Sequence, residues 1–493
     1  MQRQERLMRL KEYGFLHAEA VETVYADCGW LRTEDGARLE NLPQFCRVLL
    51  RKRPGAGSLI HTEVWLPEKW NGIFLGLGNG GMGGCMDYDA LARHIRLGYA
   101  AANTDLGTSR GRNSGIGNPD VWKDFGWRAT HEMTAVGKEL VRAYYGRPAD
   151  YAYFLGGSTG GQQGLMEAQR FPADYDGILA GMPANNRTHL HTYFLWNHIQ
   201  LRTESGRPRF SQEEIQEISR CAVRYYQGRG DGCPGDPFIT FPRPEAREVS
   251  DFIRFLGSAL SWLSAEQTAA LRRVYAGPVN PVTGRRIYNG MPIGAECYGC
   301  GIADCQAEES PHFYPFIWVF GADYDGRRFD FNEDLKALNL RLAPELNANR
   351  AELTAFHRHG GKLILYSGSA DPCVPFPDAL NYYLRAAAQA GGAEVLREYC
   401  RYFLFPGMEH GSRGMGTNAV WENESGGDAL TALRRWRETG TAPDMLTAVG
   451  YRGGDPENGI AFKRPVPCWG LGPAEMETAR SARMVCEAAY LLE

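Results

Sequence analysis

The chain of 493 residues contains a serine, an aspartate and a histidine whose order along the sequence suits nucleophilic catalysis. Ser158 lies in a Gly-x-Ser-x-Gly motif, and Asp371 and His410 each come shortly after an apolar run. In such a triad the histidine takes the serine proton and later donates it to the leaving alcohol. The aspartate fixes the imidazole tautomer and stabilises the imidazolium. We therefore predict that Ser158, Asp371 and His410 form a catalytic triad.

The segment around Ser158 has the pattern of a strand, a sharp turn and a helix. Residues 151–155 are aromatic and aliphatic, residues 156–161 are glycine-rich, and residues 162–169 have a helical pattern. The glycines allow a tight bend that exposes the serine hydroxyl near a helix N-terminus, where negative charge is favoured. The motif alone also fits an ordinary strand-to-helix turn, so the prediction of a nucleophile elbow depends on the two partners downstream.

Backbone N–H groups that could donate hydrogen bonds to the oxyanion of a tetrahedral intermediate are predicted at two places. Thr159 follows the nucleophile directly, and Gly81 belongs to the glycine-rich run 78–84 after an apolar strand at 73–77. Glycines at the end of a strand leave N–H groups unshielded, which suits an oxyanion hole. A flexible turn is the alternative interpretation of this run.

Apolar runs alternate with helical segments through much of the chain. A helix is predicted from Asp124 to Tyr145, and its His131 is interpreted as structural because it precedes the elbow inside a helix. Alternation of this kind indicates a mostly parallel sheet covered on both faces. With the order serine, acid, histidine, it predicts the α/β-hydrolase fold. Strands are predicted at residues 61–66, 73–77, 99–105, 151–155, 175–181, 363–366 and 402–405.

The regular alternation stops near Asn185 and resumes at Gly361. The sequence between them is irregular and rich in aromatic residues, Arg, Gly and Pro. We predict an inserted lid domain at residues 186–346 that walls the active site, between two parts of the hydrolase core at 1–185 and 347–493. A second domain packed elsewhere is the alternative. Amphipathic segments occur within the insertion, at 212–226 and 265–275.

The composition gives no sign of a nucleic-acid or membrane partner. The chain has 54 basic and 58 acidic residues, so its formal net charge is −4, and 43% of its residues are hydrophobic. No apolar stretch approaches the ~20 residues of a membrane helix. The charged start at residues 1–6 lacks the apolar segment of a secretory signal. We expect a cytoplasmic protein whose partner is a small molecule, with a secreted protein whose signal has been removed as the alternative.

The twelve cysteines are expected to be free or buried thiols, the default for a long chain without a secretory signal. The tightest group is Cys297, Cys300 and Cys305, with His312 as the nearest further ligand at an unusual spacing for zinc. We interpret this group as thiols or a loop disulfide rather than a zinc site. The loop 228–237 offers few carboxylates for calcium and is predicted to be a turn without metal. No metal or cofactor is predicted.

Six segments of the predicted core form a recognisable set. They are Phe-Cys-Arg-Val at 45–48, Glu-Val-Trp-Leu-Pro at 63–67, Gly-Asn-Gly-Gly at 78–81, Asp-Phe-Gly-Trp-Arg-Ala at 124–129, Ser-Thr-Gly-Gly-Gln-Gln-Gly-Leu-Met-Glu-Ala-Gln-Arg at 158–170 and Gly-Met-Glu-His at 407–410. In these segments the chain resembles the tannase and feruloyl esterase family. The resemblance covers nearly all of the core and is weak across the lid. It implies a serine esterase with a lid domain that cleaves galloyl, feruloyl and related aromatic esters, with Ser158, Asp371 and His410 as its triad.

Two departures from the family pattern matter. The resemblance implies a disulfide between a cysteine before the nucleophile and one after the histidine, but these positions are Gly157 and Gly411. Packing must then hold His410 against Ser158, which fits a reducing compartment. The family's lid often binds calcium, but Gln227 stands where an aspartate is expected, so calcium is not carried over.

The function expected from these features is hydrolysis of hydroxycinnamoyl or galloyl esters through an acyl-enzyme on the serine. Action on another ester, a lactone or a polyester fragment, and acyl transfer, are alternatives on the same fold. A binding protein that retains a hydrolase shell and a metal-dependent hydrolase built on the cysteine group are alternatives of other classes.

Overall fold

The central element of the computed structural model is a nine-stranded sheet with the order β1-β4-β5-β7-β6-β8-β9-β10-β11. The strands are β1 (Glu19–Ala26), β4 (Phe45–Lys52), β5 (Ile60–Pro67), β6 (Ile73–Leu77), β7 (Ala100–Thr104), β8 (Tyr151–Gly157), β9 (Gly177–Gly181), β10 (Lys362–Gly368) and β11 (Cys400–Phe405). The structure describes residues 3–12, 19–34, 36–227, 229, 235–242, 245–411, 414–423 and 425–471.

The sheet has a parallel part and an antiparallel part. The six strands from β7 to β11 in the sheet order are parallel, whereas β1, β4 and β5 join the sheet antiparallel. Every residue of β6, β7 and β9 is buried, as expected for strands covered on both faces. Together with the covering helices this sheet confirms the predicted α/β-hydrolase fold.

Helices cover the two faces of this sheet and form two hydrophobic cores with it. Because successive side chains of a strand point to opposite faces, Phe154 joins the core under α4, α5 and α14, and Tyr153 joins the core under α2 and α16. The helices of this part are α1 (Arg3–Glu12), α2 (Tyr88–Arg96), α3 (Pro119–Lys123), α4 (Ala129–Tyr145), α5 (Thr159–Arg170), α13 (Thr354–Arg358), α14 (Phe376–Ala390), α15 (Ala393–Arg397) and α16 (Ala429–Thr439).

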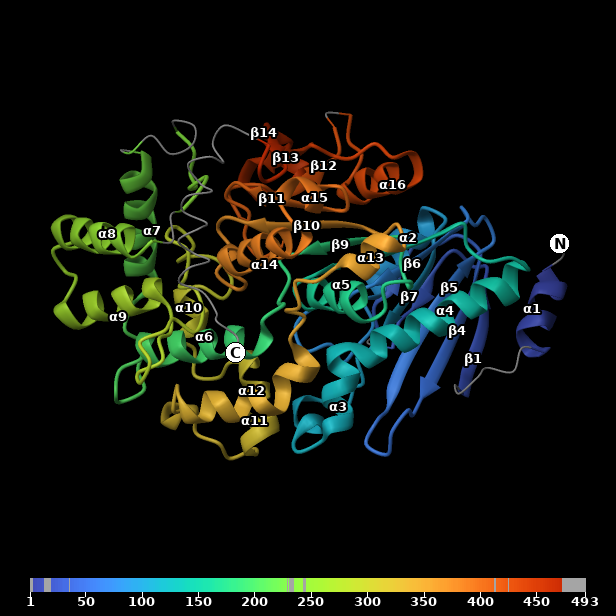
Figure 1. The fold of residues 1–493 in the computed structure, drawn as a ribbon, viewed down its shortest axis with the longest axis horizontal. Coiled ribbons are helices and arrows are strands. Elements are labelled where there is room, and N and C mark those ends of the chain that lie inside the picture. The colour runs from blue at the N-terminus through green and yellow to red at the C-terminus, as the bar shows by residue number, and fades with distance from the viewer. Residues whose placement is uncertain are drawn as a thin grey trace.

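The segment between β9 and β10, residues 182–361, is called the insertion below. It is helical, and α7, α8 and α9 lie at the end of the molecule opposite β1 (Figure 1). One hydrophobic cluster is made of insertion residues alone, between Leu201 and Cys305, and another joins Trp318 of the insertion to Phe125 beside α4. The insertion helices are α6 (Arg187–Leu201), α7 (Gln212–Gln227), α8 (Ala246–Ala259), α9 (Ala265–Ala276), α10 (Ile302–Cys305), α11 (Tyr314–Phe320) and α12 (Glu333–Leu346).

The amphipathic segments predicted in the insertion form helices α7 and α9. A capping box starts α7: the Glu214 N–H donates to Ser211 Oγ, and the Ser211 N–H donates to the Glu214 carboxylate. The apolar residues Ile215, Ile218 and Tyr225 then recur on one buried face. Helix α6 begins at Arg187 and α12 ends at Leu346, and a lid domain at 186–346 stays a prediction.

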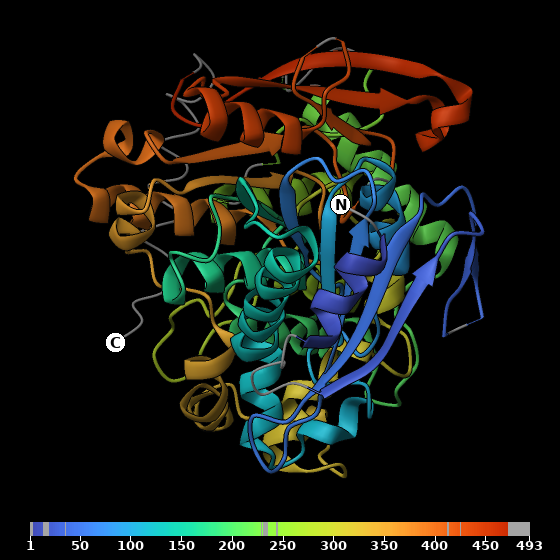
Figure 2. The ribbon, with the colours of Figure 1, turned by 90° about the vertical axis from the view of Figure 1, so that its right-hand side faces the viewer.

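A small antiparallel sheet near the C-terminus was not predicted from the sequence. It has the order β12-β13-β14 and lies beside the β10–β11 edge of the large sheet (Figure 2). Pro465 and Pro467 argue against a strand in the sequence, but β14 is an edge strand, where a missing N–H is tolerated. Arg464 of β14 forms an ion pair with Asp236 of the insertion. The strands are β12 (Ala419–Trp421), β13 (Met445–Tyr451) and β14 (Ile460–Pro467), and a separate hairpin is formed by β2 (Leu31–Arg32) and β3 (Arg38–Leu39).

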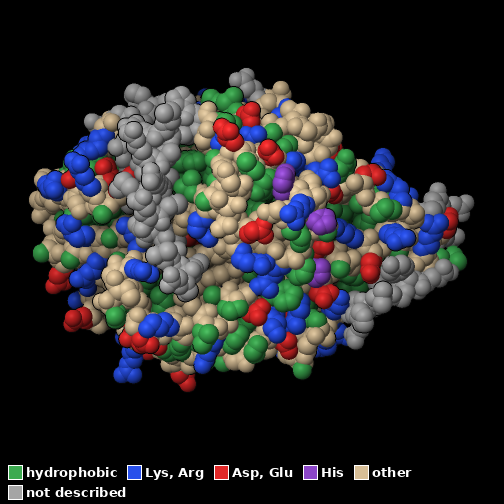
Figure 3. Space-filling view, in the orientation of Figure 1, with side chains coloured by type: hydrophobic (Ala, Val, Ile, Leu, Met, Phe, Trp, Pro, Cys, Tyr) green, Lys and Arg blue, Asp and Glu red, His purple; other side chains and the backbone are tan. Residues whose placement is uncertain are grey.

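The surface carries both signs of charge. Basic and acidic side chains are interspersed on the face seen in Figure 3. Within the described part of the chain, no helix combines the length and the apolar character that crossing a bilayer requires.

Candidate active site

Ser158 lies in the sharp turn between β8 and α5. Its backbone has φ 59° and ψ −118°, a strained conformation for a residue with a side chain. The Ser158 N–H donates to the Gly181 carbonyl oxygen of the neighbouring strand at 2.9 Å, which holds the turn in place. A Cβ atom on Gly156 would lie 2.6 Å from the backbone of Gly160, so the turn requires glycine there. This is the geometry of a nucleophile elbow.

Asp371 and His410 follow β10 and β11 and are in direct contact. His410 Nδ1 lies 2.8 Å from Asp371 Oδ2. The other carboxylate oxygen accepts the backbone N–H groups of Cys373 and Val374, at 2.8 and 2.9 Å. Asp371 is fully buried, whereas the His410 side chain is 23% exposed. The carboxylate is therefore fixed, and the imidazole stays partly exposed.

The electrostatics of this pair favour a protonated imidazole. Burial lowers the pKa of His410, but the charge and the hydrogen bond of Asp371, together with the charges of Cys300 and Glu409, raise it by more, so the pKa lies above its ordinary value.

The three predicted triad residues all follow parallel strands, β8, β10 and β11, so they lie at the same edge of the sheet. The structure brings Asp371 and His410 together. It contains no hydrogen bond between Ser158 Oγ and the His410 imidazole among the residues that it describes. Catalytic hydrogen bonds of this kind are often long without a substrate and tighten in the complex.

The two residues predicted for the oxyanion hole lie next to each other. Thr159 Oγ1 donates to the Gly81 carbonyl oxygen at 2.5 Å, and the Gly160 N–H donates to the Asn79 carbonyl oxygen at 2.7 Å. Gly81 has φ +53°, a conformation that favours glycine. Within the described chain, the N–H groups of Gly81 and Thr159 have no protein acceptor, so both can donate to a bound oxyanion.

A buried arginine supports these loops, and sequence reasoning missed it. Arg187, at the start of α6, is 3% exposed. Its guanidinium donates to Thr159 Oγ1 at 2.9 Å and to the Tyr314 hydroxyl at 2.8 Å, and it lies over the Phe125 ring. No described carboxylate lies within ion-pair distance of it. A charged residue at the start of the helix that follows the buried strand β9 was the available sequence signal.

Ser158 opens into a cavity of about 440 Å³ between the core and the insertion. The walls are largely apolar and aromatic, and a pocket of this size suits a small aromatic ligand. Its lining includes Gly81, Met82, Thr159, Ala184, Arg187, Leu190, His191, Phe194, His312, Tyr314, Cys373 and Val374.

The cysteine group predicted from the sequence is divided in the structure. Cys300 lies beside His312 and Cys373, whereas Cys305 Sγ contacts the Cys300 carbonyl oxygen and Cys297 Sγ contacts the chain elsewhere. The ten described cysteines are free thiols, which agrees with the prediction of thiols. The hydrogen bond with Cys373 lowers the pKa of the Cys300 thiol to about 5, with a further contribution from His312.

His131 does not line this cavity. His131 Nδ1 contacts Asp174 at 2.7 Å and its ring stacks on Phe171, which is the satisfied structural role predicted for it. The loop at 228–237, predicted to be a turn without metal, lies largely outside the described residues. Gln227, the last residue of α7, donates to the Asp236 carbonyl oxygen.

Comparison with known proteins places the chain in a family. The profile described as "Tannase and feruloyl esterase" matches residues 46–308 and 314–490. The chain is 32% identical over 485 residues to an uncharacterized esterase of Xanthomonas campestris pv. campestris, covering 89% of this chain and 83% of that protein. It is 31% identical over 448 residues to a probable feruloyl esterase B-2 of Aspergillus flavus, covering 85% and 82%.

A solved structure agrees with this assignment. The crystal structure of feruloyl esterase B from Aspergillus oryzae superposes with a TM-score of 0.80 at 25% identity, covering 95% of this chain and 97% of that one. The match therefore spans both the sheet and the insertion. The chain belongs to the tannase and feruloyl esterase family and is a carboxylic ester hydrolase.

Proposed function

We propose that this esterase cleaves aromatic esters, of hydroxycinnamoyl or galloyl type, through an acyl-enzyme on Ser158. The observation that carries the proposal is the contact between His410 and the buried Asp371 at the sheet edge that also presents Ser158 in a strained turn. Serine, imidazole and buried carboxylate at one edge are the parts that acyl transfer requires.

In the proposed first half-reaction, His410 Nε2 takes the Ser158 proton as Oγ attacks the ester carbonyl carbon. The tetrahedral intermediate collapses when the imidazolium donates this proton to the leaving alkoxide, which departs as the alcohol. Water then attacks the acyl-enzyme with His410 again as base, and the acid leaves. Asp371, held by two backbone N–H groups, keeps Nδ1 protonated and stabilises the imidazolium.

The oxyanion of each intermediate would accept hydrogen bonds from the backbone N–H groups of Thr159 and Gly81. The contact of Thr159 Oγ1 with the Gly81 carbonyl oxygen supports this role, because it keeps the two peptide groups side by side. Donors that are already oriented cost no reorganisation when charge develops on the carbonyl oxygen.

The cavity walls support an aromatic acyl group. Leu190, Phe194 and Tyr314 come from the insertion and would face the ring, with Val374 from the core. An offset or edge-to-face arrangement of the substrate ring with Phe194 or Tyr314 would add to the binding from burial alone. The names of the relatives point the same way, since feruloyl esters carry a phenolic ring. The insertion would then act as the lid that excludes water.

A hydrolysis panel tests the proposal: methyl ferulate, methyl p-coumarate, methyl gallate and short-chain nitrophenyl esters, with wild type and Ser158→Ala. We expect a higher kcat/KM for at least one aryl ester than for nitrophenyl acetate, and a loss of roughly 10⁴-fold or more in the variant. Unchanged thermal unfolding of Ser158→Ala is the control for folding. Near-normal rates in that folded variant, or no turnover of any aryl ester by the wild type, would overturn it.

A further inference from the structure

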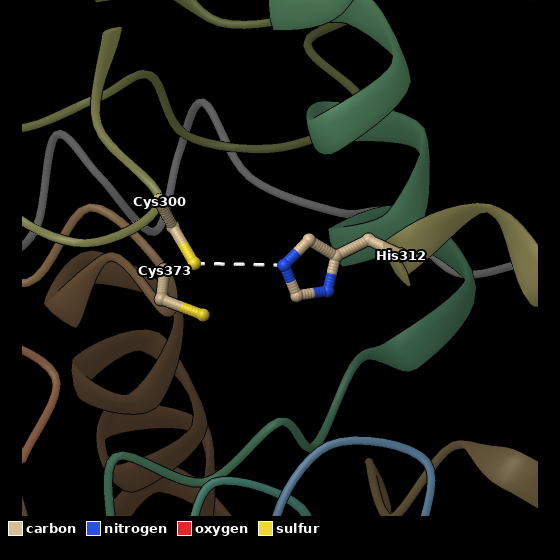
Figure 4. Close-up of side chains that lie close together, drawn as sticks. All are labelled: Cys300, His312 and Cys373. Atoms are coloured by element: carbon tan, nitrogen blue, oxygen red, sulfur yellow. Dashed lines mark hydrogen bonds between the residues drawn. The ribbon is translucent and has the colours of Figure 1, made fainter. Parts of the chain in front are cut away.

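Three soft ligand groups from three segments of the chain converge beside the catalytic pocket. Cys300 precedes α10, His312 lies in the short helix Pro311–Phe313 before α11, and Cys373 lies in the turn between β10 and α14. Their Sγ, Nε2 and Sγ atoms all lie within 4.8 Å of one another. Figure 4 shows the three side chains pointing toward a common point. Cys300 and His312 belong to the insertion, whereas Cys373 belongs to the core.

The spacing of these atoms also fits the coordination of one metal ion. Cys300 Sγ lies 3.5 Å from His312 Nε2. A tetrahedral zinc with Zn–S of about 2.3 Å and Zn–N of about 2.0 Å holds its sulfur and nitrogen ligands about 3.5 Å apart. Two thiolates and one imidazole are a donor set that zinc prefers, and they leave a fourth position for water.

The ligand groups are held in place before any metal binds. Cys300 has φ +67°, which is uncommon for a residue with a side chain, and its N–H donates to Asp304 Oδ2 at 2.7 Å. The His312 ring stacks on Phe194 with 4.1 Å between ring centroids. Backbone strain of this kind persists only where the surroundings enforce it, and it concentrates at ligand sites.

We propose that Cys300, His312 and Cys373 form a binding site for one Zn²⁺ ion that links the insertion to the core. Binding would displace the thiol protons of the two cysteines, and the two thiolates would balance the charge of the ion. Water would complete the coordination. His312 and Cys373 also line the cavity that contains Ser158, so the metal would lie in its wall.

The site differs from the one considered from sequence spacing. Cys297 and Cys305, which flank Cys300 in the sequence, are not its partners: Cys305 Sγ contacts the Cys300 carbonyl oxygen, and Cys297 Sγ contacts the Ile215 carbonyl oxygen. The third ligand comes instead from Cys373, which lies 73 residues after Cys300 in the sequence. Cys297 is exposed, so it provides a matched control in the same loop.

The test uses the full-length protein, freed of metal with a chelator and kept under a thiol-free reductant. Zn²⁺ is titrated against a chromophoric chelator, and Co²⁺ serves as a spectroscopic probe. We expect one ion per chain, with sulfur-to-cobalt charge-transfer absorption. Substituting a residue that only supports a metal ligand already lowers metal affinity about 10–100-fold. Loss of a ligand itself should therefore lower the affinity for Zn²⁺ at least about 100-fold, in each of Cys300→Ser, Cys373→Ser and His312→Ala. Cys297→Ser should bind as the wild type does.

Several results would overturn the site. They are the absence of stoichiometric Zn²⁺ binding by the reduced wild type, equal binding by Cys300→Ser and Cys297→Ser, or a Cys300–Cys373 disulfide that persists under reductant. A second readout keeps the test decisive if one variant folds poorly, because Zn²⁺ should raise the Tm of wild type and Cys297→Ser but not of His312→Ala. None of these measurements depends on ester hydrolysis, so failure of the proposed substrate class would not affect them.

Discussion

The carboxylate of Asp371 contacts His410 Nδ1 through one oxygen and the backbone N–H groups of Cys373 and Val374 through the other. This carboxylate is fully buried, so its charge acts on the imidazole with little screening by water. The turn from residue 371 to residue 374 therefore sets both the position and the proton affinity of His410. It also carries the core ligand of the proposed metal site, Cys373.

The first prediction concerns the pH dependence of hydrolysis. Only the neutral imidazole of His410 can accept the serine proton. Its pKa lies above 6.5 despite burial, because Asp371 raises it with additional contributions from Cys300 and Glu409. Activity should therefore fall as the pH decreases, with an acid limb whose midpoint in kcat/KM lies above 6.5. A pH–rate profile with one aryl ester measures it.

Asp371→Asn provides the matched comparison. Removing the charge should move the acid limb to lower pH and reduce kcat roughly 10⁴-fold, because the wrong tautomer is favoured. An acid limb that stays at the same pH in this variant would mean that another group titrates.

The second prediction concerns Arg187. Its guanidinium donates to Thr159 Oγ1 and to the Tyr314 hydroxyl in a buried position, so it fixes the loop that carries one oxyanion donor. Hydrogen bonds to a charged group contribute about 1.5–3 kcal/mol. Arg187→Gln should lower kcat about 10-fold or more. Steady-state kinetics and thermal unfolding of the variant separate this effect from a loss of fold.

Arg187→Lys is the control that retains the charge. Because one ammonium group cannot reproduce both directed hydrogen bonds, we expect this variant to recover only part of the rate. Full activity in both variants would contradict a positioning role for Arg187.

The third prediction uses two glycines of the loop after β6. A Cβ atom on Gly78 would lie 2.5 Å from the Gly160 backbone, whereas a Cβ on Gly80 would meet nothing within 4 Å. Gly78→Ala should push apart the loops that carry Gly81 and Thr159. We expect a loss of about 1–3 kcal/mol in unfolding free energy together with a loss of activity.

Gly80→Ala should change the unfolding free energy by about 0.5 kcal/mol or less and retain activity. Denaturant unfolding and initial rates of the two variants give the comparison. Equal unfolding free energies and equal activities in the two alanine variants would contradict the idea that close contact between the two loops positions the oxyanion donors.

Much of the core could be predicted from the sequence because its signals are local. The run at 73–77 is continuous and apolar, and it forms β6 with the same bounds. Apolar runs after 361 likewise mark β10 and β11, and Asp371 and His410 follow them within a few residues, in the expected order. Glycines in the elbow indicate a tight turn that leaves no room for side chains, and this signal is local to the sequence.

Other features depend on contacts between distant segments, which local patterns do not encode. Arg187 acts on Thr159 only because α6 begins beside the elbow, and Cys373 meets Cys300 only because the insertion folds back onto the core. The strand β14 was missed because prolines count against a strand unless its edge position is known. In each of these cases the missing information is a contact with a segment that is distant in the sequence.

The central claim is that Ser158 is the nucleophile activated by His410. It is tested most directly by labelling the wild type with a serine-directed aryl phosphonate, followed by peptide mapping by mass spectrometry. We predict one adduct per chain, on the peptide that contains Ser158, with labelling abolished in Ser158→Ala and slowed in His410→Ala. An adduct on a different residue, or labelling at an undiminished rate in either variant, would contradict the account.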